Sequence, residues 1–363
     1  MAYGLRRRRL SQIPSGPSTS QASSTILNKG DTRAPVEGVG GLPRQPLMAA
    51  AYADRMEIAG AESAETCLIA GCGYVGGRLA RRMEGLGPVL ALVRTRASAD
   101  ALTREGLRAI PANFDGDSME WPLGVPSDLG SVVYLAPPAG TGTEDLRLAA
   151  FLKALDAARP RVLLYFSTTG VYGNTGGAPV DERTLAAPQE VRSRQRLDAE
   201  GRVARWCEAR GVRWVVFRVP GIYGPHRLPL DRLQRGEPLL RDEDSGPGNR
   251  IHVDDLVEAC LAALERPVAG VFNLTDGQPE SMAEFMSRVA ALAGLPAPPR
   301  VSWVEAQSSM SPGILAFLRQ SRRVMSCRSQ ELGWRPRFGN PGDGIRASLR
   351  EMGWVGPISN EIQ

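Results

Sequence analysis

Residues 66–76, with the sequence TCLIAGCGYVG, carry the strongest structural signal in the chain. The apolar run Thr66–Ala70 is long enough for one buried strand, and three glycines follow it with the spacing G-x-G-x-x-G. In this pattern Gly71 makes the tight turn and Gly73 lets a pyrophosphate approach the backbone, while Gly76 lets the next helix pack closely on the strand. The stretch therefore predicts a dinucleotide-binding loop; the alternative is a glycine-rich turn without a ligand.

The helix that begins in this loop, with Tyr74 and Val75 in its first turn, presents free N–H groups and the positive end of its dipole to a phosphate. Strand-like and helix-like segments alternate on both sides of it and onward along the chain. Such alternation predicts an α/β fold, namely a Rossmann-type doubly wound parallel sheet. The expected strands are Thr66–Ala70, Pro88–Val93, Ser131–Ala136, Arg161–Ser167 and Val212–Arg218, and the expected helices are Val75–Leu86, Glu144–Ala158 and Gln189–Arg210.

After Gly221 the composition of the chain changes, and segments rich in proline and glycine, which indicate loops, become frequent. We therefore predict a Rossmann domain over residues 61–225 and a small C-terminal α/β substrate lobe over residues 226–356, interleaved with it. Helices of this second part are expected near Val253–Leu264, Ser281–Ala293 and Gly342–Met352.

Residues 1–60 form a different kind of sequence. Four arginines, Arg6–Arg9, precede a stretch rich in serine, proline and glycine that has too few large apolar residues to fold alone. Three interpretations stay open: a mis-assigned start, with Met48 or Met56 as the true one; a disordered tail; or an organelle transit peptide, since the first acidic residue is Asp31.

The composition is that of an ordinary globular protein, with 42% hydrophobic and 23% charged residues. No apolar run is long enough to span a membrane. The five cysteines show no metal-ligand spacing and are too few for a disulfide scaffold, so we expect a cytoplasmic protein without a metal. The net charge of +5 comes mainly from residues 1–60, which argues against nucleic acid as a partner.

The second strand ends in Arg94-Thr95-Arg96, where an NAD site usually has an acidic residue. Guanidinium groups bind phosphate in a bidentate manner, so Arg94 and Arg96 suit the 2′-phosphate of NADP. The sequence favours NADP over NAD; the alternative is that both arginines are solvated surface residues.

Four segments together resemble the extended short-chain dehydrogenases/reductases, the sugar-nucleotide epimerase/dehydratase group. They are FSTTGVYG (Phe166–Gly173), RVPGIYGP (Arg218–Pro225), RIHVDD (Arg250–Asp255) and FNLTDG (Phe272–Gly277). The resemblance runs from about residue 66 to residue 354. It implies a nicotinamide cofactor, a small-molecule substrate and a homodimer formed through the two long helices.

The family's catalytic set is a Ser or Thr together with Tyr-x-x-x-Lys. The resemblance places the Ser/Thr position at Thr168. In the family a proline lies four residues before the tyrosine and an acid four residues after the lysine. Pro188 and Glu200 therefore place the two positions at Arg192 and Arg196, so that both catalytic residues are replaced by arginine.

Arginine stays protonated and has no acceptor, so Arg192 is a poor general acid or base. Arg196 can still donate to a ribose hydroxyl and is expected to bind the cofactor. Arg194 adds a third cation two residues away from each. The chain resembles the atypical branch of the superfamily, which lacks the standard proton relay.

Three functions stay open. The first is an oxidoreductase or epimerase-like enzyme with a relocated acid or base, acting on a small anionic or sugar-like substrate. The second is an NADP-binding sensor or scaffold with little turnover, and the third is a non-redox isomerase or lyase. The candidates for the relocated group are Tyr172, Tyr223, His226, His252 and Glu182.

The resemblance assigns tentative catalytic roles to Thr168 and Tyr172, since Tyr172 belongs to a loop that lines the substrate cleft in the family. It also implies that Arg192, Tyr223 and His226 bind substrate. A structural role is expected for His252, which would cap or brace the helix that begins near Asp254.

Overall fold

The computed structural model describes residues 65–115, 119–140 and 142–356. All of them lie in one compact unit, Glu57–Gln363. The predictions made for residues 1–60 therefore fall outside the described residues.

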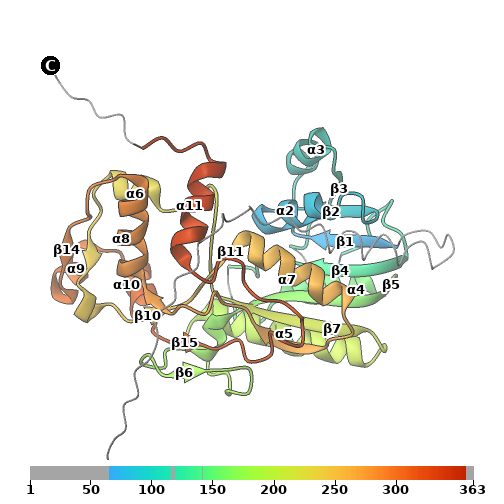
Figure 1. The fold of residues 1–363 in the computed structure, drawn as a ribbon. Helices are drawn as coiled ribbons and strands as arrows, with labels where there is room; N and C mark the ends of the chain where they lie inside the picture. Colours follow the sequence, from blue (N-terminus) through green and yellow to red (C-terminus); the bar gives the residue numbers. More distant parts are fainter. Residues whose placement is uncertain (1–64, 116–118, 141, 357–363) are drawn as a thin grey trace, which may run out of the picture. The chain divides into compact units, whose positions relative to one another are not determined.

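Seven parallel strands form the central sheet (Figure 1). The strand order reverses at β1, which lies between β2 on one side and β4 on the other. This is the doubly wound arrangement predicted from the sequence, and its switch point is where such sheets bind ligands. In spatial order the strands are β12 (Gly270–Asn273), β7 (Arg213–Val219), β5 (Arg159–Thr168), β4 (Asp128–Tyr134), β1 (Thr66–Ala70), β2 (Val89–Val93) and β3 (Arg108–Pro111).

Both faces of the sheet are covered, which is why its strands are continuous apolar runs. Alternate residues of β1 face opposite sides: Ile69 packs in the cluster with α2 and α7, and Leu68 packs in the cluster with α4 and α5. The helix α3 packs on β2 and β3. These helices are α2 (Tyr74–Arg82), α3 (Arg96–Arg104), α4 (Leu146–Leu155), α5 (Val191–Glu208) and α7 (Val253–Glu265), and a 3₁₀ turn, η1 (Thr169–Tyr172), follows β5.

The C-terminal part builds a third apolar cluster, in which α8 packs against α6 and α11. In Figure 1, α6, α8, α9 and α10 gather on one side of the sheet, and α11 stands between them and the sheet. The helices are α6 (Leu230–Gln234), α8 (Met282–Ala293), α9 (Trp303–Ser309), α10 (Pro312–Leu318) and α11 (Pro341–Glu351), with a 3₁₀ turn, η2 (Asp242–Asp244).

Four pairs of short strands tie the C-terminal part together and join it to the loops beyond the sheet. They are β6 (Pro179–Val180) with β15 (Arg323–Val324), β8 (Gly221–Tyr223) with β11 (Arg250–His252), β9 (Leu239–Leu240) with β14 (Arg300–Val301), and β10 (Pro247–Gly248) with β13 (Glu280–Ser281). All are parallel except the last pair.

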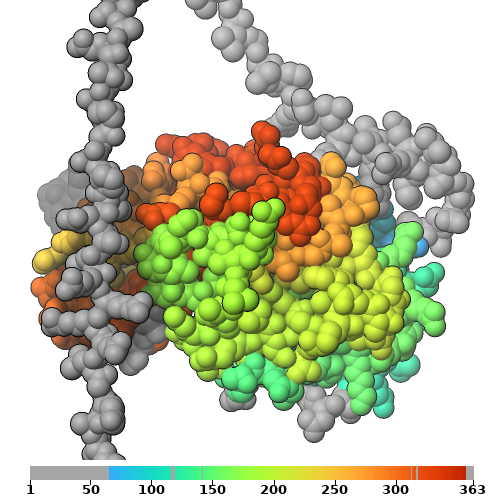
Figure 2. Space-filling model, turned by 90° about the horizontal axis from the view of Figure 1, so that it is seen from below, coloured from blue at the N-terminus to red at the C-terminus, as the bar shows by residue number. Residues whose placement is uncertain are grey.

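The segment after β15 lies across the loop that follows β6. The Glu182 carboxylate accepts hydrogen bonds from Cys327 N and Arg328 N, at 3.2 and 3.3 Å. Figure 2 shows the corresponding orange-red surface directly beside the green one. Glu182 also accepts from Asn273 N at 3.0 Å, so this candidate acid is a structural clamp between three segments.

The division into residues 61–225 and 226–356 stays a prediction. Strand β12 and helix α7 come from the second range and pack on the first. A homodimer through α4 and α5 also stays a prediction. Within the described part of the chain, no helix combines the length and the hydropathy needed to cross a membrane.

Candidate functional site

The three glycines after β1 differ in the space around them. Gly71 has φ of +87°, and a Cβ there would lie 2.5 Å from Ala136 N. At Gly76 a Cβ would lie 3.0 Å from Leu135 Cδ1 and 3.1 Å from an Ile69 methyl, so this glycine lets α2 approach the sheet. At Gly73, in contrast, a Cβ would meet no atom within 4 Å. Two glycines are thus required by the fold, and the third borders open space.

The N-terminus of α2 faces this open space without a capping side chain. Gly73 is the N-cap, and the first turn, with Tyr74, Val75 and Gly76, contains no acidic residue. Its free N–H groups and the helix dipole favour an anion. The loop therefore fits the pyrophosphate of a dinucleotide, as the sequence predicts.

The end of β2 presents an exposed cation near Asp115, whose pKa is lowered by Arg147 and, to a smaller extent, by the charge of Arg94. Arg94 is exposed and makes no hydrogen bond or ion pair with the other described residues. Thr95 is the N-cap of α3, with its hydroxyl accepting from Ser98 N at 3.1 Å. Arg96, expected at the strand end, is instead the first residue of α3, where it pairs with Asp100 at 3.0 Å with 82% of its side chain exposed. Arg94 is therefore the residue most available to a 2′-phosphate.

Thr168 ends β5 and begins the 3₁₀ turn, with its hydroxyl accepting from Gly170 N at 3.1 Å. The first turn of α5 packs on this turn, because a Cβ at Gly170 would lie 2.6 Å from Ser193 Oγ. Arg192, the neighbour of Ser193, is exposed and makes no hydrogen bond or ion pair with the other described residues. The structure therefore brings Thr168 and the start of α5 together at the carboxyl edge of the sheet.

Arg196 lies one turn further along α5 and points at the ends of two strands. Its Nη1 donates to Phe166 O at 2.9 Å and to Tyr165 Oη at 3.0 Å. It also reaches Ala136 O, after β4, at 3.4 Å. Arg196 thus bridges β4 and β5 near the switch point.

A buried ion pair lies behind these residues. Glu200 of α5 accepts from Arg218 Nη2 at 2.7 Å and from Ser167 Oγ at 2.5 Å, and both charged groups are less than a tenth exposed. The Arg218 guanidinium lies 4.8 Å from the ring centre of Tyr172. The Tyr172 hydroxyl is buried and donates to Asn273 Oδ1 at 2.8 Å. Burial also raises the pKa of Tyr172, so its environment is that of a packing residue.

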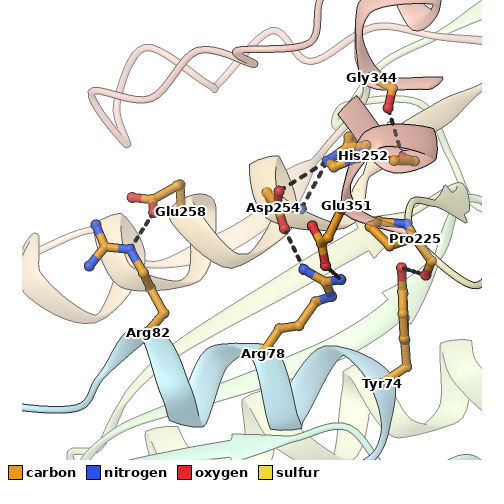
Figure 3. Close-up of polar contacts among 10 residues, drawn as sticks. Tyr74, Arg78, Arg82, Pro225, His252, Asp254, Glu258, Gly344 and Glu351 are labelled. Atoms are coloured by element: carbon orange, nitrogen blue, oxygen red, sulfur yellow. Dashed lines mark hydrogen bonds and ion pairs between the residues drawn. The ribbon is translucent and has the colours of Figure 1, made fainter. Parts of the chain in front are cut away.

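Tyr74 connects the glycine loop to the loop after β8. Its hydroxyl donates to Pro225 O at 2.8 Å (Figure 3). The Arg227 guanidinium lies 4.4 Å from the centre of the Tyr74 ring. His226, between Pro225 and Arg227, has φ of +60°, which is uncommon for a residue other than glycine. Its side chain is exposed, and its N–H donates to Met352 Sδ at 3.1 Å. His226 therefore lies in a loop held directly against the glycine loop.

Ion pairs extend this connection along α2. Arg78 pairs with Asp254 of α7 at 3.1 Å and with Glu351 of α11 at 2.5 Å, and Arg82 pairs with Glu258 at 2.8 Å (Figure 3). The helix that begins in the glycine loop is thus fastened to the C-terminal part.

His252 and Tyr223 lie inside the protein. His252 Nδ1 accepts from Asp254 N at 3.2 Å, so His252 caps α7 as expected, and burial lowers its pKa to about 4. Tyr223 is 2% exposed and packs edge-on against His252 and Phe285. Burial raises the pKa of Tyr223, and its hydroxyl has no hydrogen-bond partner among the described residues. Tyr223 is therefore placed in the core of the C-terminal part.

A second buried polar cluster surrounds Arg250, whose guanidinium lies 4.2 Å from the ring centre of Phe285 and donates to Glu280 O at 3.1 Å. Asp276 is 4% exposed, and its Oδ2 finds no hydrogen-bond partner in the described part of the chain. Burial raises the pKa of Asp276 to about 7, with Arg250 opposing the shift and the carboxylates of Glu280 and Asp255 adding to it. Asp276 thus resists ionisation in the folded state.

Replacing Asp276 with asparagine is expected to reduce the pH dependence of stability. A carboxyl with a raised pKa binds its proton more tightly when folded, so stability falls as pH rises from about 4 to about 7. Between pH 4 and pH 8, the free energy of unfolding of the variant should therefore change more favourably than that of the parent, by about 1–3 kcal/mol. Urea unfolding at both pH values measures this difference. Asp242→Asn, at an exposed carboxylate, is the control, and an equal slope in Asp276→Asn and the parent would contradict the assignment.

Several contacts around this site could not be predicted from the sequence. Pro225 and Arg227 lie about 150 positions from Tyr74, and only the fold brings them together. Asp115, after β3, pairs with Arg147 of α4, which also donates to Pro137 O and Pro138 O. This pair fixes the loop after β4 at the same edge of the sheet.

Comparisons with known proteins agree with this arrangement. Residues 143–275 match the model of the NAD dependent epimerase/dehydratase family. A putative GDP-L-fucose synthase 2 from Oryza sativa subsp. japonica is 26% identical over 307 residues, which cover 77% of this chain and 84% of that protein.

Two solved structures share the fold over nearly their whole length. A conserved protein of unknown function from Silicibacter pomeroyi is 29% identical, with a TM-score of 0.67 over 79% of this chain and 99% of that one. The UDP-glucuronic acid 4-epimerase from Bacillus cereus, solved with UDP-glucuronic acid and NAD, is 19% identical, with a TM-score of 0.61 over 79% and 99%. These matches confirm the fold class and the resemblance found in the sequence.

Proposed function

We propose that this chain is an NADP-dependent oxidoreductase acting on a small anionic substrate. The match of residues 143–275 to the NAD dependent epimerase/dehydratase family model supports the proposal. The observation that carries the proposal is the glycine loop, which is tight at Gly71 and Gly76 and open at Gly73. The nicotinamide cofactor is supported by the family match and by the NAD complex of the Bacillus cereus epimerase.

In this proposal Gly73 and the N-terminus of α2 hold the pyrophosphate, with Tyr74 and Val75 in the same turn. Arg94 binds the 2′-phosphate, with Thr95 and Arg96 beside it at the start of α3. Arg196 donates to the ribose near the ends of β4 and β5. A bound nicotinamide dinucleotide supplies reversible hydride transfer.

The substrate site is proposed at the same edge. Arg192 supplies an exposed, unpaired cation that attracts a carboxylate or phosphate, and the Thr168 hydroxyl orients a substrate oxygen. His226 adds a titratable side chain in the loop held by Tyr74. Both Arg192 and Arg196 lack an acceptor, so neither takes the role of a general base. Tyr172 and Tyr223 are left as packing residues because both hydroxyls are buried.

The absence of a tyrosine and a lysine at these two positions is part of the proposal. With arginine at both positions, we expect proton transfer to use a side chain outside the first turns of α5. A screen of the full chain with NADPH and a panel of carbonyl acids tests turnover by the loss of reduced-nicotinamide absorbance. Turnover by a panel member supports the enzyme. Tight NADPH binding without turnover of any panel member would support the sensor instead.

Arg94→Ala is expected to weaken NADPH binding about tenfold and to leave NADH binding within about twofold, because only the 2′-phosphate contact is lost. Titration of both cofactors by intrinsic fluorescence measures the two affinities. Arg104→Ala, at an exposed arginine that ends the following helix α3, is the matched control. If Arg94→Ala lost affinity for NADPH and NADH equally, Arg94 would not bind the 2′-phosphate.

A further inference from the structure

A cavity of about 170 Å³ lies in the C-terminal part, between β9, α8 and α10. Its lining is mainly apolar and includes three methionines. The principal apolar side chains are Leu239, Leu240, Met282, Met286, Met310 and Ile314. Leu239, Leu240 and Met286 are almost fully buried, whereas Ile314 is 39% exposed, so the cavity reaches the surface beside Ile314.

The charged side chain of the lining and the backbone of β9 already have partners. The charged side chain in the lining, Arg232, pairs with Glu237 at 2.7 Å. The backbone of β9 is used by its neighbour: Leu239 N donates to Pro299 O at 2.9 Å, and Leu240 O accepts from Arg300 Nη1 at 2.8 Å. Ser245 is the other polar side chain of the lining.

This lining does not suit a nucleoside diphosphate. A base and a pyrophosphate placed here would lose their hydrogen bonds with water and find few partners in return. The occupant is therefore expected to differ from the UDP-sugar bound by the Bacillus cereus epimerase.

Size and chemistry favour a single aromatic ring. An apolar cavity of about 150 Å³ is known to stay dry and to bind benzene. Methionine sulfur makes favourable contacts with ring edges, and flexible methionine side chains adapt to a flat ligand. A ring thus fits the volume and the three thioethers, with Met286 nearly fully buried in the wall.

A chain of hydrogen-bonded segments connects the cavity with the turn that begins at Thr168. Ser245 is followed by β10, where Pro247 O accepts from Arg322 N at 3.0 Å. The Arg322 guanidinium donates to Gly173 O at 2.7 Å, and Gly173 ends the turn that begins at Thr168. One connected set of segments therefore links the cavity to the carboxyl edge of the sheet.

We propose that this cavity binds the aromatic ring of the substrate, which is then an aryl-substituted carboxylic acid. The inference rests on the proposed function for the carboxylate, which is assigned to the cations at the strand ends. The ring site itself depends only on the cavity, so the two can be tested apart.

The test is a titration of the full chain with trans-cinnamate, followed by NMR of ¹³C-labelled methionine methyl groups. Ring currents are expected to shift the signals of Met282, Met286 and Met310 but not that of Met325, which is half exposed outside the lining. UDP-glucose should cause none of these shifts. The proposal would be overturned if cinnamate shifted none of the three signals. It would also be overturned if UDP-glucose shifted them and cinnamate could not displace the bound UDP-glucose.

A filled cavity supplies the second readout. Ile314→Trp is expected to weaken cinnamate binding at least about tenfold. Val304→Trp, on the exposed face of α9 and outside the lining, should leave it within about twofold. Equal affinities in the two variants would count against the cavity. Because the methyl shifts are measured on the parent chain, the proposal stays testable even where a variant fails to fold.

A parallel NADPH titration separates the two proposals. If Ile314→Trp loses cinnamate binding and the parent does not bind NADPH, the ring site is supported and the proposed oxidoreductase function is rejected. If the parent binds NADPH but cinnamate does not shift the methionine signals, the cofactor site is supported and the ring site is rejected.

Discussion

Replacing Gly73 with alanine is expected to lower the affinity for NADPH by at least about 30-fold, or ~2 kcal/mol. The new methyl group would occupy the space through which the pyrophosphate approaches the backbone. It meets no protein atom within 4 Å, so the folded chain has room for it. The free energy of unfolding should fall by no more than about 1 kcal/mol, the usual effect of alanine at an N-cap.

The matched control is Gly77→Ala, one turn further along α2. Its Cβ would lie 3.6 Å from Arg81 Nη1, an ordinary contact. Titration calorimetry measures both affinities, and urea unfolding measures both stabilities. Unchanged NADPH affinity in Gly73→Ala would show that the cofactor does not approach this loop.

Replacing Glu200 with glutamine is expected to lower the free energy of unfolding by about 3–5 kcal/mol. The Arg218 guanidinium is buried and receives its compensating charge from Glu200. Without that charge Arg218 is left as an unpaired buried cation, which is far less stable than the pair. Urea unfolding measures the loss.

Two comparisons identify the buried charge as the cause. Glu208→Gln, at an exposed position of the same helix, should change stability by less than about 0.5 kcal/mol. The double variant Glu200→Met/Arg218→Met removes both charges and is expected to recover at least half of the loss, because apolar groups can replace a buried pair. A double variant less stable than Glu200→Gln would contradict this account.

The sheet could be predicted from the sequence because its strands are buried on both faces and appear as unbroken apolar runs. Thr66–Ala70 is predicted with the bounds that the structure has. The helix predicted as Val75–Leu86 ends earlier, at Arg82, because the chain turns at Gly85 with φ of +80°. The glycine spacing likewise predicts the loop, since close contacts require a glycine at Gly71 and at Gly76.

Helix α3 has no counterpart among the predicted elements. Of its nine residues only Ala99 is buried, so the sequence lacks the apolar periodicity of a packed helix. Its start is fixed by the Thr95 cap, and this moves Arg96 from the strand end into the helix. The start of α3 is therefore set by local hydrogen bonding and not by a hydrophobic pattern that the sequence shows.

Burial of the tyrosines could not be predicted because it depends on distant partners. Tyr172 is held by Asn273, about 100 positions away, and Tyr223 packs against His252 and Phe285. A family loop indicates the position of a residue along the chain. The side chains packed around it decide whether its hydroxyl reaches the cleft.

Direct titration of the full chain with NADPH, NADH and their oxidised forms is the measurement that bears most closely on the proposed cofactor site. Saturable binding with NADPH at least about tenfold tighter than NADH is the predicted result. Absence of binding by all four dinucleotides would contradict the proposed function, whatever the fold.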